Sequence, residues 1–164
     1  MKIKNFFRKI KFAFQRVKRG FSDYDVWDID MWFCKTVPAM LERLAETTHG
    51  YPHQFWQAYN IDVANGAMTT HEADEAAYKN WQMTLYQMAD ALREAHECTR
   101  KKSNPYEHAY FDELTKGGKV NLKTASSDIA NAYLQHEIEL QTYSERKLEE
   151  GLNLFKENFY NLWD

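Results

Sequence analysis

The fold is decided by residues 69–101, TTHEADEAAYKNWQMTLYQMADALREAHECTRK, near the middle of the 164-residue chain. Thr69 and Glu72 have the spacing of a capping box, in which the two side chains satisfy free backbone N–H groups at a helix start. Apolar side chains then recur at steps of three and four, which places them on one helical face. They are Tyr78, Trp81, Leu85, Met88, Leu92 and Ala95. The pattern predicts a long amphipathic helix that ends near Lys101.

Three other segments show the same periodicity, and they complete the predicted fold. Residues 2–19 form the first, and residues 23–48 form the second, which Pro38 should kink or divide because proline cannot donate a backbone hydrogen bond. The last starts at Ser126 or Ser127 and continues to Trp163, with two offset apolar stripes that require a bend or a change of packing partner. A packed loop with one short helix is expected over 53–68, and a short helix over 106–114. No alternating run predicts a strand. The expected fold is all-α: a compact bundle of about four main helices, one of them a basic amphipathic helix at the N-terminus.

The composition indicates a folded domain. Hydrophobic residues make up 44% of the chain and charged residues 27%, with only six Gly and three Pro, which excludes a collagenous or largely disordered chain. No run approaches the ~18 apolar residues of a membrane span, and no secretory signal is recognisable, so a cytoplasmic protein is expected. Cys34 and Cys98 belong to no C-x-x-C pair, and both are expected to be buried thiols. The sequence does not indicate an oligomeric state.

Charge divides the chain into two parts, residues 1–20 and residues 21–164. The first part holds eight basic residues and no acid, whereas the second holds 13 basic and 24 acidic residues, a net charge of −11. In the N-terminal helix the apolar residues share an arc of about 100° at about 100° per residue, and all eight cations lie outside it. We call this set the apolar arc. It consists of Ile3, Phe6, Phe7, Ile10, Phe14 and Val17.

Three roles are open for this N-terminal helix. The favoured one is docking of its apolar arc on the acidic helical domain, because amphipathic helices usually pack against a core. The helix is alternatively suited to an anionic membrane or a partner's groove, or to nucleic-acid phosphates. The candidate residues for contact with a partner or an anionic surface are Lys4, Arg8, Lys11, Phe12, Arg16 and Arg19.

Carboxylates are concentrated in the next segment, at Asp23, Asp25, Asp28 and Asp30. Their spacing lacks the central glycine and the distal glutamate of an EF-hand, so no metal site is predicted. Ser22 with Asp25 instead has capping spacing, and the acids are expected to cap a helix or to pair with Arg16 or Arg19. Trp27, within the same segment, is expected to be buried.

No catalytic motif is recognisable. His96 and His136 lie beside apolar stripes with glutamates nearby, but the Glu-x-x-His spacing of a di-metal bundle is missing, and both are interpreted as core or boundary residues. There is no nucleophile elbow and no phosphate-binding glycine loop. The sequence therefore favours a protein that is not an enzyme and that has no cofactor.

One family resemblance rests on Arg19-Gly20-Phe21-Ser22-Asp23-Tyr24-Asp25-Val26-Trp27-Asp28-Ile29-Asp30, together with Gly50-Tyr51-Pro52 and Leu162-Trp163-Asp164. These segments resemble a family of small, mostly uncharacterised proteins of tailed bacteriophages and prophages. The resemblance covers the first third of the chain and its extreme C-terminus. It implies a phage origin and no known chemistry.

That context leads to three functional hypotheses. The first is a non-enzymatic interaction protein that inhibits a host defence or another host process in the bacterial cytoplasm by binding a macromolecule. The alternatives are a virion or assembly component and a nucleic-acid-associated protein that uses residues 2–19. Aromatic residues are abundant enough to supply an interface as well as a core. Trp163 is expected either to cap the core with a docked C-terminus or to meet a partner.

Overall fold

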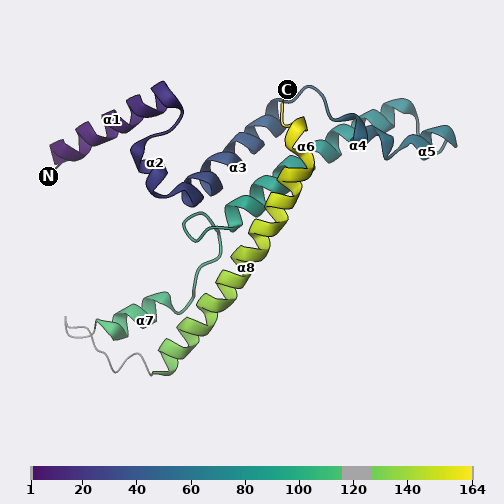
Figure 1. The fold of residues 1–164 in the computed structure, drawn as a ribbon. Helices are drawn as coiled ribbons and strands as arrows, with labels where there is room; N and C mark the ends of the chain where they lie inside the picture. The colour runs from purple at the N-terminus through teal and green to yellow at the C-terminus, as the bar shows by residue number, and fades with distance from the viewer. Residues whose placement is uncertain (1, 116–126, 164) are drawn as a thin grey trace.

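The protein is all-α, as predicted, and the computed structural model describes residues 2–115 and 127–163 (Figure 1). Side chains are described from Phe6 onward, so Lys4 and Ile3, like Asp164, lie outside the described side chains. The long helices are α1 (Lys2–Arg19), α3 (Ile29–Thr47), α6 (Thr70–Glu94) and α8 (Asp128–Asn158). The short ones are α2 (Asp23–Trp27), α4 (His53–Gln57), α5 (Asn60–Ala64), α7 (Glu107–Leu114) and the 3-10 turn η3 (Phe159–Asn161). The described residues contain no strand.

Helix α6 is the centre of the fold, and α3 and α8 both pack on it (Figure 1). Its predicted apolar stripe forms the core: Trp81, Leu85, Met88 and Leu92 are fully buried. Leu41 and Ala45 complete this core from α3. The capping box at the start of α6 is also confirmed, because Thr69 accepts a hydrogen bond from the Glu72 backbone and Glu72 accepts one from the Thr69 backbone. The sequence stretch at the middle of the chain thus supplies the helix on which α3 and α8 pack.

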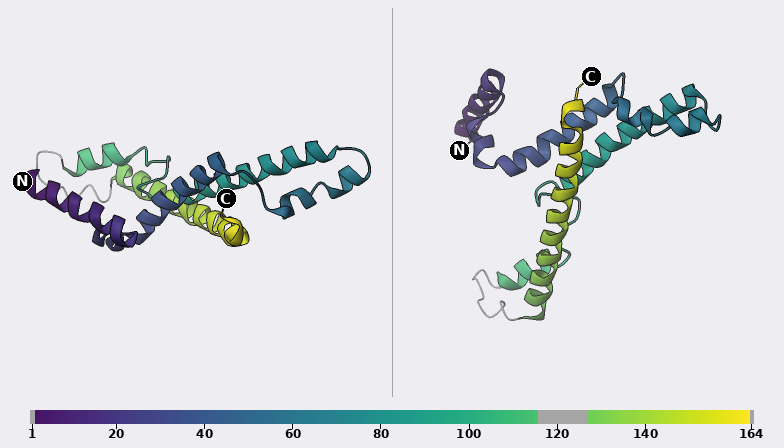
Figure 2. Two further views of the ribbon diagram at one scale, coloured as in Figure 1. Left: turned by 90° about the horizontal axis from the view of Figure 1, so that it is seen from above. Right: turned by 45° about the vertical axis from the view of Figure 1, so that its right-hand side comes forward.

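The bundle is more open than a compact globule. Its accessible surface is 12009 Å², whereas a compact monomer of this mass exposes about 8,500 Å². The views in Figure 2 show why: α1, the α4–α5 end and the α7 end extend away from the place where α3, α6 and α8 meet. Much side-chain surface is therefore left outside a shared core.

Three details of the helices differ from the sequence predictions. The second predicted helix is not divided at Pro38, which is buried within α3; it is interrupted at Asp28, whose backbone (φ −144°, ψ 68°) is not helical. Helix α6 ends at Glu94 rather than near Lys101, because the Glu94 carboxylate accepts the Lys101 backbone N–H at 3.0 Å and so stabilises a turn. Residues 53–68 form two short helices where one was predicted.

The change of apolar stripe along α8 reflects a change of packing partner. The helix is continuous from Asp128 to Asn158, with Ser127 as its cap. Its N-terminal part contacts α7, where Tyr133 stacks on Tyr110 with 4.4 Å between ring centroids, and its C-terminal part packs on α6. No helix in the described parts of the chain is both long enough and apolar enough to cross a membrane.

Candidate functional site

Helix α1 is attached to α2 through its cationic side. The Arg16 guanidinium donates to both carboxylate oxygens of Asp25, at 2.9 and 2.5 Å. Asp23 pairs with Lys11 at 3.2 Å and also with Arg19. The pairs with Arg16 and Arg19 are those that the sequence predicted for the acidic segment, whereas the pair with Lys11 was not predicted. They show that part of the basic arm is used within the chain.

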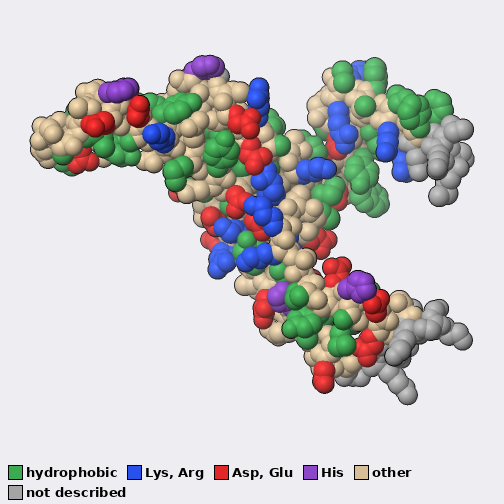
Figure 3. Space-filling model, turned by 180° about the vertical axis from the view of Figure 1, so that it is seen from behind, with side chains coloured by type: hydrophobic (Ala, Val, Ile, Leu, Met, Phe, Trp, Pro, Cys, Tyr) green, Lys and Arg blue, Asp and Glu red, His purple; other side chains and the backbone are tan. Residues whose placement is uncertain are grey.

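The apolar arc of α1 faces away from these contacts. Phe12, expected on the cationic side, packs there against Tyr24 with 5.9 Å between ring centroids. At about 100° per residue, the side that contacts α2 lies about 160° from the centre of the arc. The described side chains of the arc are 49–86% exposed. In Figure 3 hydrophobic and basic side chains lie next to each other on this separate helix. The expected docking of the arc on the body is therefore wrong, because α1 is mounted by its opposite face.

The Ser22–Asp25 capping box fixes the attachment of α1 to α2. The buried Asp25 carboxylate accepts hydrogen bonds from the Ser22 backbone N–H at 2.7 Å and from its hydroxyl at 2.9 Å. The Arg16 guanidinium, together with these Ser22 donors, holds the pKa of Asp25 well below its usual range, although burial opposes the shift. Asp25 therefore stays ionised at neutral pH and joins the start of α2 to α1.

We expect Asp25→Ala to weaken the attachment of α1 to α2 by about 1–3 kcal/mol, because it removes hydrogen bonds to a charged group. Faster backbone amide exchange across α2 measures the effect. A carboxyl group whose pKa is lower in the folded state stabilises the fold at pH values above its unfolded pKa of about 4. This stabilisation is lost as the pH falls from there toward the folded-state pKa. The difference between Asp25→Ala and the native chain should therefore shrink in acid. Asp23→Ala is the control, since that carboxylate is half exposed and should matter less. Equal exchange in both variants at neutral pH would contradict this account.

Trp27 is not buried, contrary to the sequence prediction. Its side chain is 90% exposed at the end of α2, where the chain breaks at Asp28 before α3 begins. Helix α2 has only five residues, and Asp25 is the one that is buried, beside α1. Trp27 is the last residue of α2, and no further turn follows to cover its ring. Cys98 is likewise exposed, in the turn after α6, whereas Cys34 is buried as expected.

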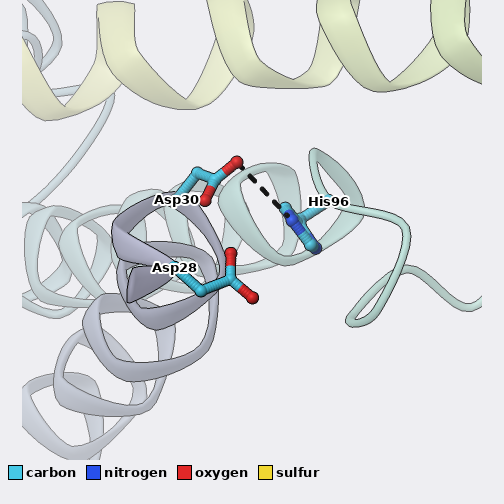
Figure 4. A group of neighbouring side chains, drawn as sticks. All are labelled: Asp28, Asp30 and His96. Atoms are coloured by element: carbon cyan, nitrogen blue, oxygen red, sulfur yellow. Dashed lines mark ion pairs between the residues drawn. The ribbon is translucent and has the colours of Figure 1, made fainter. Parts of the chain in front are cut away.

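Asp28, Asp30 and His96 are brought together where α3 begins and α6 has ended (Figure 4). One potential ligand atom of each lies within 4.8 Å of the others. The His96 Nε2 atom is 3.8 Å from Asp30 Oδ2. A hydrogen bond between the two side chains raises the pKa of Asp28 and lowers that of Asp30.

The orientation of His96 favours a hydrogen-bonding role over metal binding. Its Nδ1 atom accepts the Cys98 backbone N–H at 3.1 Å, which in the neutral ring places the proton on Nε2, facing the carboxylates. A metal ion at Nε2 would require that proton to move to Nδ1, where it would oppose the Cys98 N–H. We therefore interpret the cluster as a polar link between α3 and the end of α6. His136 lies elsewhere, 3.3 Å from Glu139 on α8.

An extended apolar depression lies between α3 and α8, and we call it the α3/α8 groove. It consists of two neighbouring cavities of about 450 and 610 Å³. Helix α3 contributes Ile29, Phe33, Val37, Met40 and Leu44, and helix α8 contributes Leu148, Leu152, Phe155 and Phe159. The Phe33 and Phe155 rings meet edge to face, with 6.2 Å between centroids. Because α3 and α8 both pack on α6, the groove follows the two helices and is open to solvent.

The C-terminus is docked in part, as the sequence suggested. Leu162 packs on the core and borders the α3/α8 groove. Trp163 is mostly exposed, at the rim of a cavity of about 140 Å³ that Trp81, Tyr51 and Pro52 also line. Its indole N–H donates to the Tyr160 carbonyl at 3.1 Å. Trp163 therefore reaches solvent beside the core and does not cap it.

The sequence predictions missed the groove, although they contained a signal for it. The second of the two offset stripes in the last predicted helix contains Leu148, Leu152, Phe155 and Phe159, and in the structure Phe159 is half exposed. An apolar stripe on a helix that already packs through Leu140, Ser144 and Gly151 implies a second apolar face. No family model, curated protein or solved structure matches the chain.

Proposed function

We propose that the protein is a non-enzymatic interaction protein that binds an amphipathic helix of a protein partner in the α3/α8 groove. The observation that supports this function is the groove itself, an apolar depression between two helices on a third. An apolar helix face laid in such a groove is a recurring mode of peptide recognition. A fourth helix would complete the bundle that α3, α6 and α8 begin.

The dimensions of the groove suit a helical ligand. From Ile29 to Leu44 its α3 wall is about 22 Å long at 1.5 Å per residue, the length of about four helical turns. Aromatic side chains at its centre, Phe33 and Phe155, are residues of the kind that anchor interfaces. Its polar edge at Asp30 and His96 offers a place to recognise one end of the ligand.

The biological setting of this function comes from the resemblance to phage proteins and is part of the proposal. In that setting the partner is a host protein in the bacterial cytoplasm, and the binding inhibits a host defence or another host process. A virion or assembly component is the alternative, with a phage protein as the partner. Nucleic-acid binding is less well supported, because Lys11, Arg16 and Arg19 already pair with Asp23 and Asp25.

A matched pair of methionine substitutions tests the groove. Met40 lies in the groove and is 64% exposed, whereas Met83 lies on α6 outside it and is 56% exposed. Met40→Glu should reduce capture of a protein partner from a lysate of phage-infected host cells by about tenfold or more, because a carboxylate would be buried on binding. Met83→Glu should leave capture unchanged. Both variants should fold, since both side chains are exposed.

The captured protein is identified by mass spectrometry, and its binding is then measured with purified components. Binding that is equally strong with Met40→Glu and Met83→Glu would exclude the groove as the site. Capture of phage structural proteins alone, still dependent on Met40, would favour the assembly role over inhibition of the host.

A further inference from the structure

We propose that α1 lies on the surface of an anionic lipid bilayer, with its apolar arc in the outer acyl region and its lysines among the headgroups. This interaction is separate from the α3/α8 groove and gives the protein a second binding surface. It assigns a role to the exposed apolar side chains of α1.

The way in which α1 is attached to α2 leaves its apolar arc uncovered. Arg16 and Arg19 hold α2 on one side of the helix, so the apolar arc points outward on the other. Phe7, Phe14 and Val17 are each more than half exposed. The three views of the fold agree that α1 stands apart from α6 and α8 (Figures 1 and 2). A flat surface can therefore reach the described side chains of the arc without displacing another element.

Cationic side chains lie beside both edges of the apolar arc. At about 100° per residue, Lys18 lies next to one edge of the arc, and Lys9 lies near the other. Among the described residues, no ion pair occupies Arg8, Lys9 or Lys18. Lysine side chains at both edges can extend from a buried stem to lipid phosphates, as they do in helices that lie in a membrane interface.

Long-range charge explains why the partner is anionic lipid and why α1 is separated from the rest of the chain. Residues 1–20 contain no acid, so nothing in the arm repels a negative surface. Residues 21–164 carry a net charge of −11 and would be repelled by the same surface. An arm that stands away from an acidic body allows attraction of one part while the other stays in solution. A nucleic acid would neutralise the same cations but would leave the apolar arc in water.

The shape and length of α1 indicate binding in the plane of the bilayer. Its 18 residues span about 27 Å, and cations occur along its whole length. A helix with that charge distribution can place one face in the headgroup and acyl boundary, but cannot enter the hydrocarbon core.

Vesicle flotation with the full-length protein tests the proposal. We expect binding to phosphatidylcholine vesicles that contain phosphatidylglycerol, much weaker binding to phosphatidylcholine alone, and a decrease with added salt. Phe14→Glu should lower the affinity by about tenfold or more, because it places a charge in the arc. Met83→Glu is the control, since Met83 is exposed on α6 away from α1, and should bind normally. Circular dichroism checks that both variants keep their helical content.

The outcomes separate this interaction from the groove. Met40→Glu should bind vesicles normally, and Phe14→Glu should still capture the groove's protein partner. No binding to anionic vesicles, or equal binding by Phe14→Glu and the native chain, would overturn the proposal. If Phe14→Glu instead converts a dimer in solution to a monomer and no vesicle binding occurs, the arc is covered by a second copy of the chain and the proposal is wrong.

Discussion

Replacing Trp81 by alanine is expected to lower the free energy of unfolding by about 3–5 kcal/mol. The Trp81 side chain is 1% exposed and belongs to the core cluster that α6 shares with α3. Its ring lies 5.3 Å from the Phe55 ring, centroid to centroid, so it also holds α4 against α6. Because domains of this size are stable by only about 5–15 kcal/mol, the loss would consume a large part of the total.

Trp27→Ala is the matched control for this experiment. Trp27 is 90% exposed, and its truncation should change the stability by no more than about 0.5 kcal/mol. Urea unfolding followed by circular dichroism measures both variants. Similar losses in the two variants would show that the core is not organised around Trp81 or that Trp27 is covered in solution.

The sequence predicted the elements that are specified locally. The capping boxes at Thr69 and Ser22 require only residues three positions apart, and both formed as expected. The stripe from Trp81 to Leu92 indicated a buried helix face because a long run at 3.6-residue spacing has one dominant explanation. The ion pair between Arg16 and Asp25 could be predicted for the same reason, since only nine positions separate the two residues.

Side-chain burial that depends on the placement of whole helices was not predictable in this way. The apolar arc of α1 has the pattern of a core-facing helix, but periodicity identifies a face and does not identify what covers it. Asp25 determines which face of α1 makes contact, because its buried carboxylate binds Arg16 and so holds α1 by its polar side. Trp27 became exposed for a related reason, because the break at Asp28 ends α2 before a second turn could cover the ring.

The candidate sites depend on contacts between distant segments. His96 approaches Asp28 and Asp30 across more than 60 positions of sequence, and no spacing rule relates them. The α3/α8 groove depends on α3 and α8 both lying on α6 without closing on each other. The apolar faces that line the groove were visible in the sequence as stripes, but their separation is a property of the assembled helices.

A second large loss of stability is expected from a substitution where α8 packs on α6. Gly151 is buried on α8, and a Cβ atom there would lie 2.7 Å from Leu92 Cδ2 and 3.0 Å from the Leu92 backbone nitrogen. Valine in a helix gains only a few tenths of a kcal/mol over glycine. Overpacking a filled core typically costs about 1–3 kcal/mol and sometimes more. We therefore expect Gly151→Val to destabilise the protein, because the steric cost exceeds the gain in helix propensity.

Two further variants show whether the close approach to Leu92 is the cause. Gly50→Ala is the control, since a Cβ atom at Gly50 meets nothing within 4 Å, and it should leave the stability nearly unchanged. Leu92→Ala alone should be destabilising because it opens a cavity, but that cavity provides room for a side chain at position 151. Thermal unfolding of the double variant should consequently show a smaller loss than the sum of the two single losses. Strictly additive losses would mean that α8 moves away from α6 to accept the valine and that the close approach to Leu92 is not the cause of the loss.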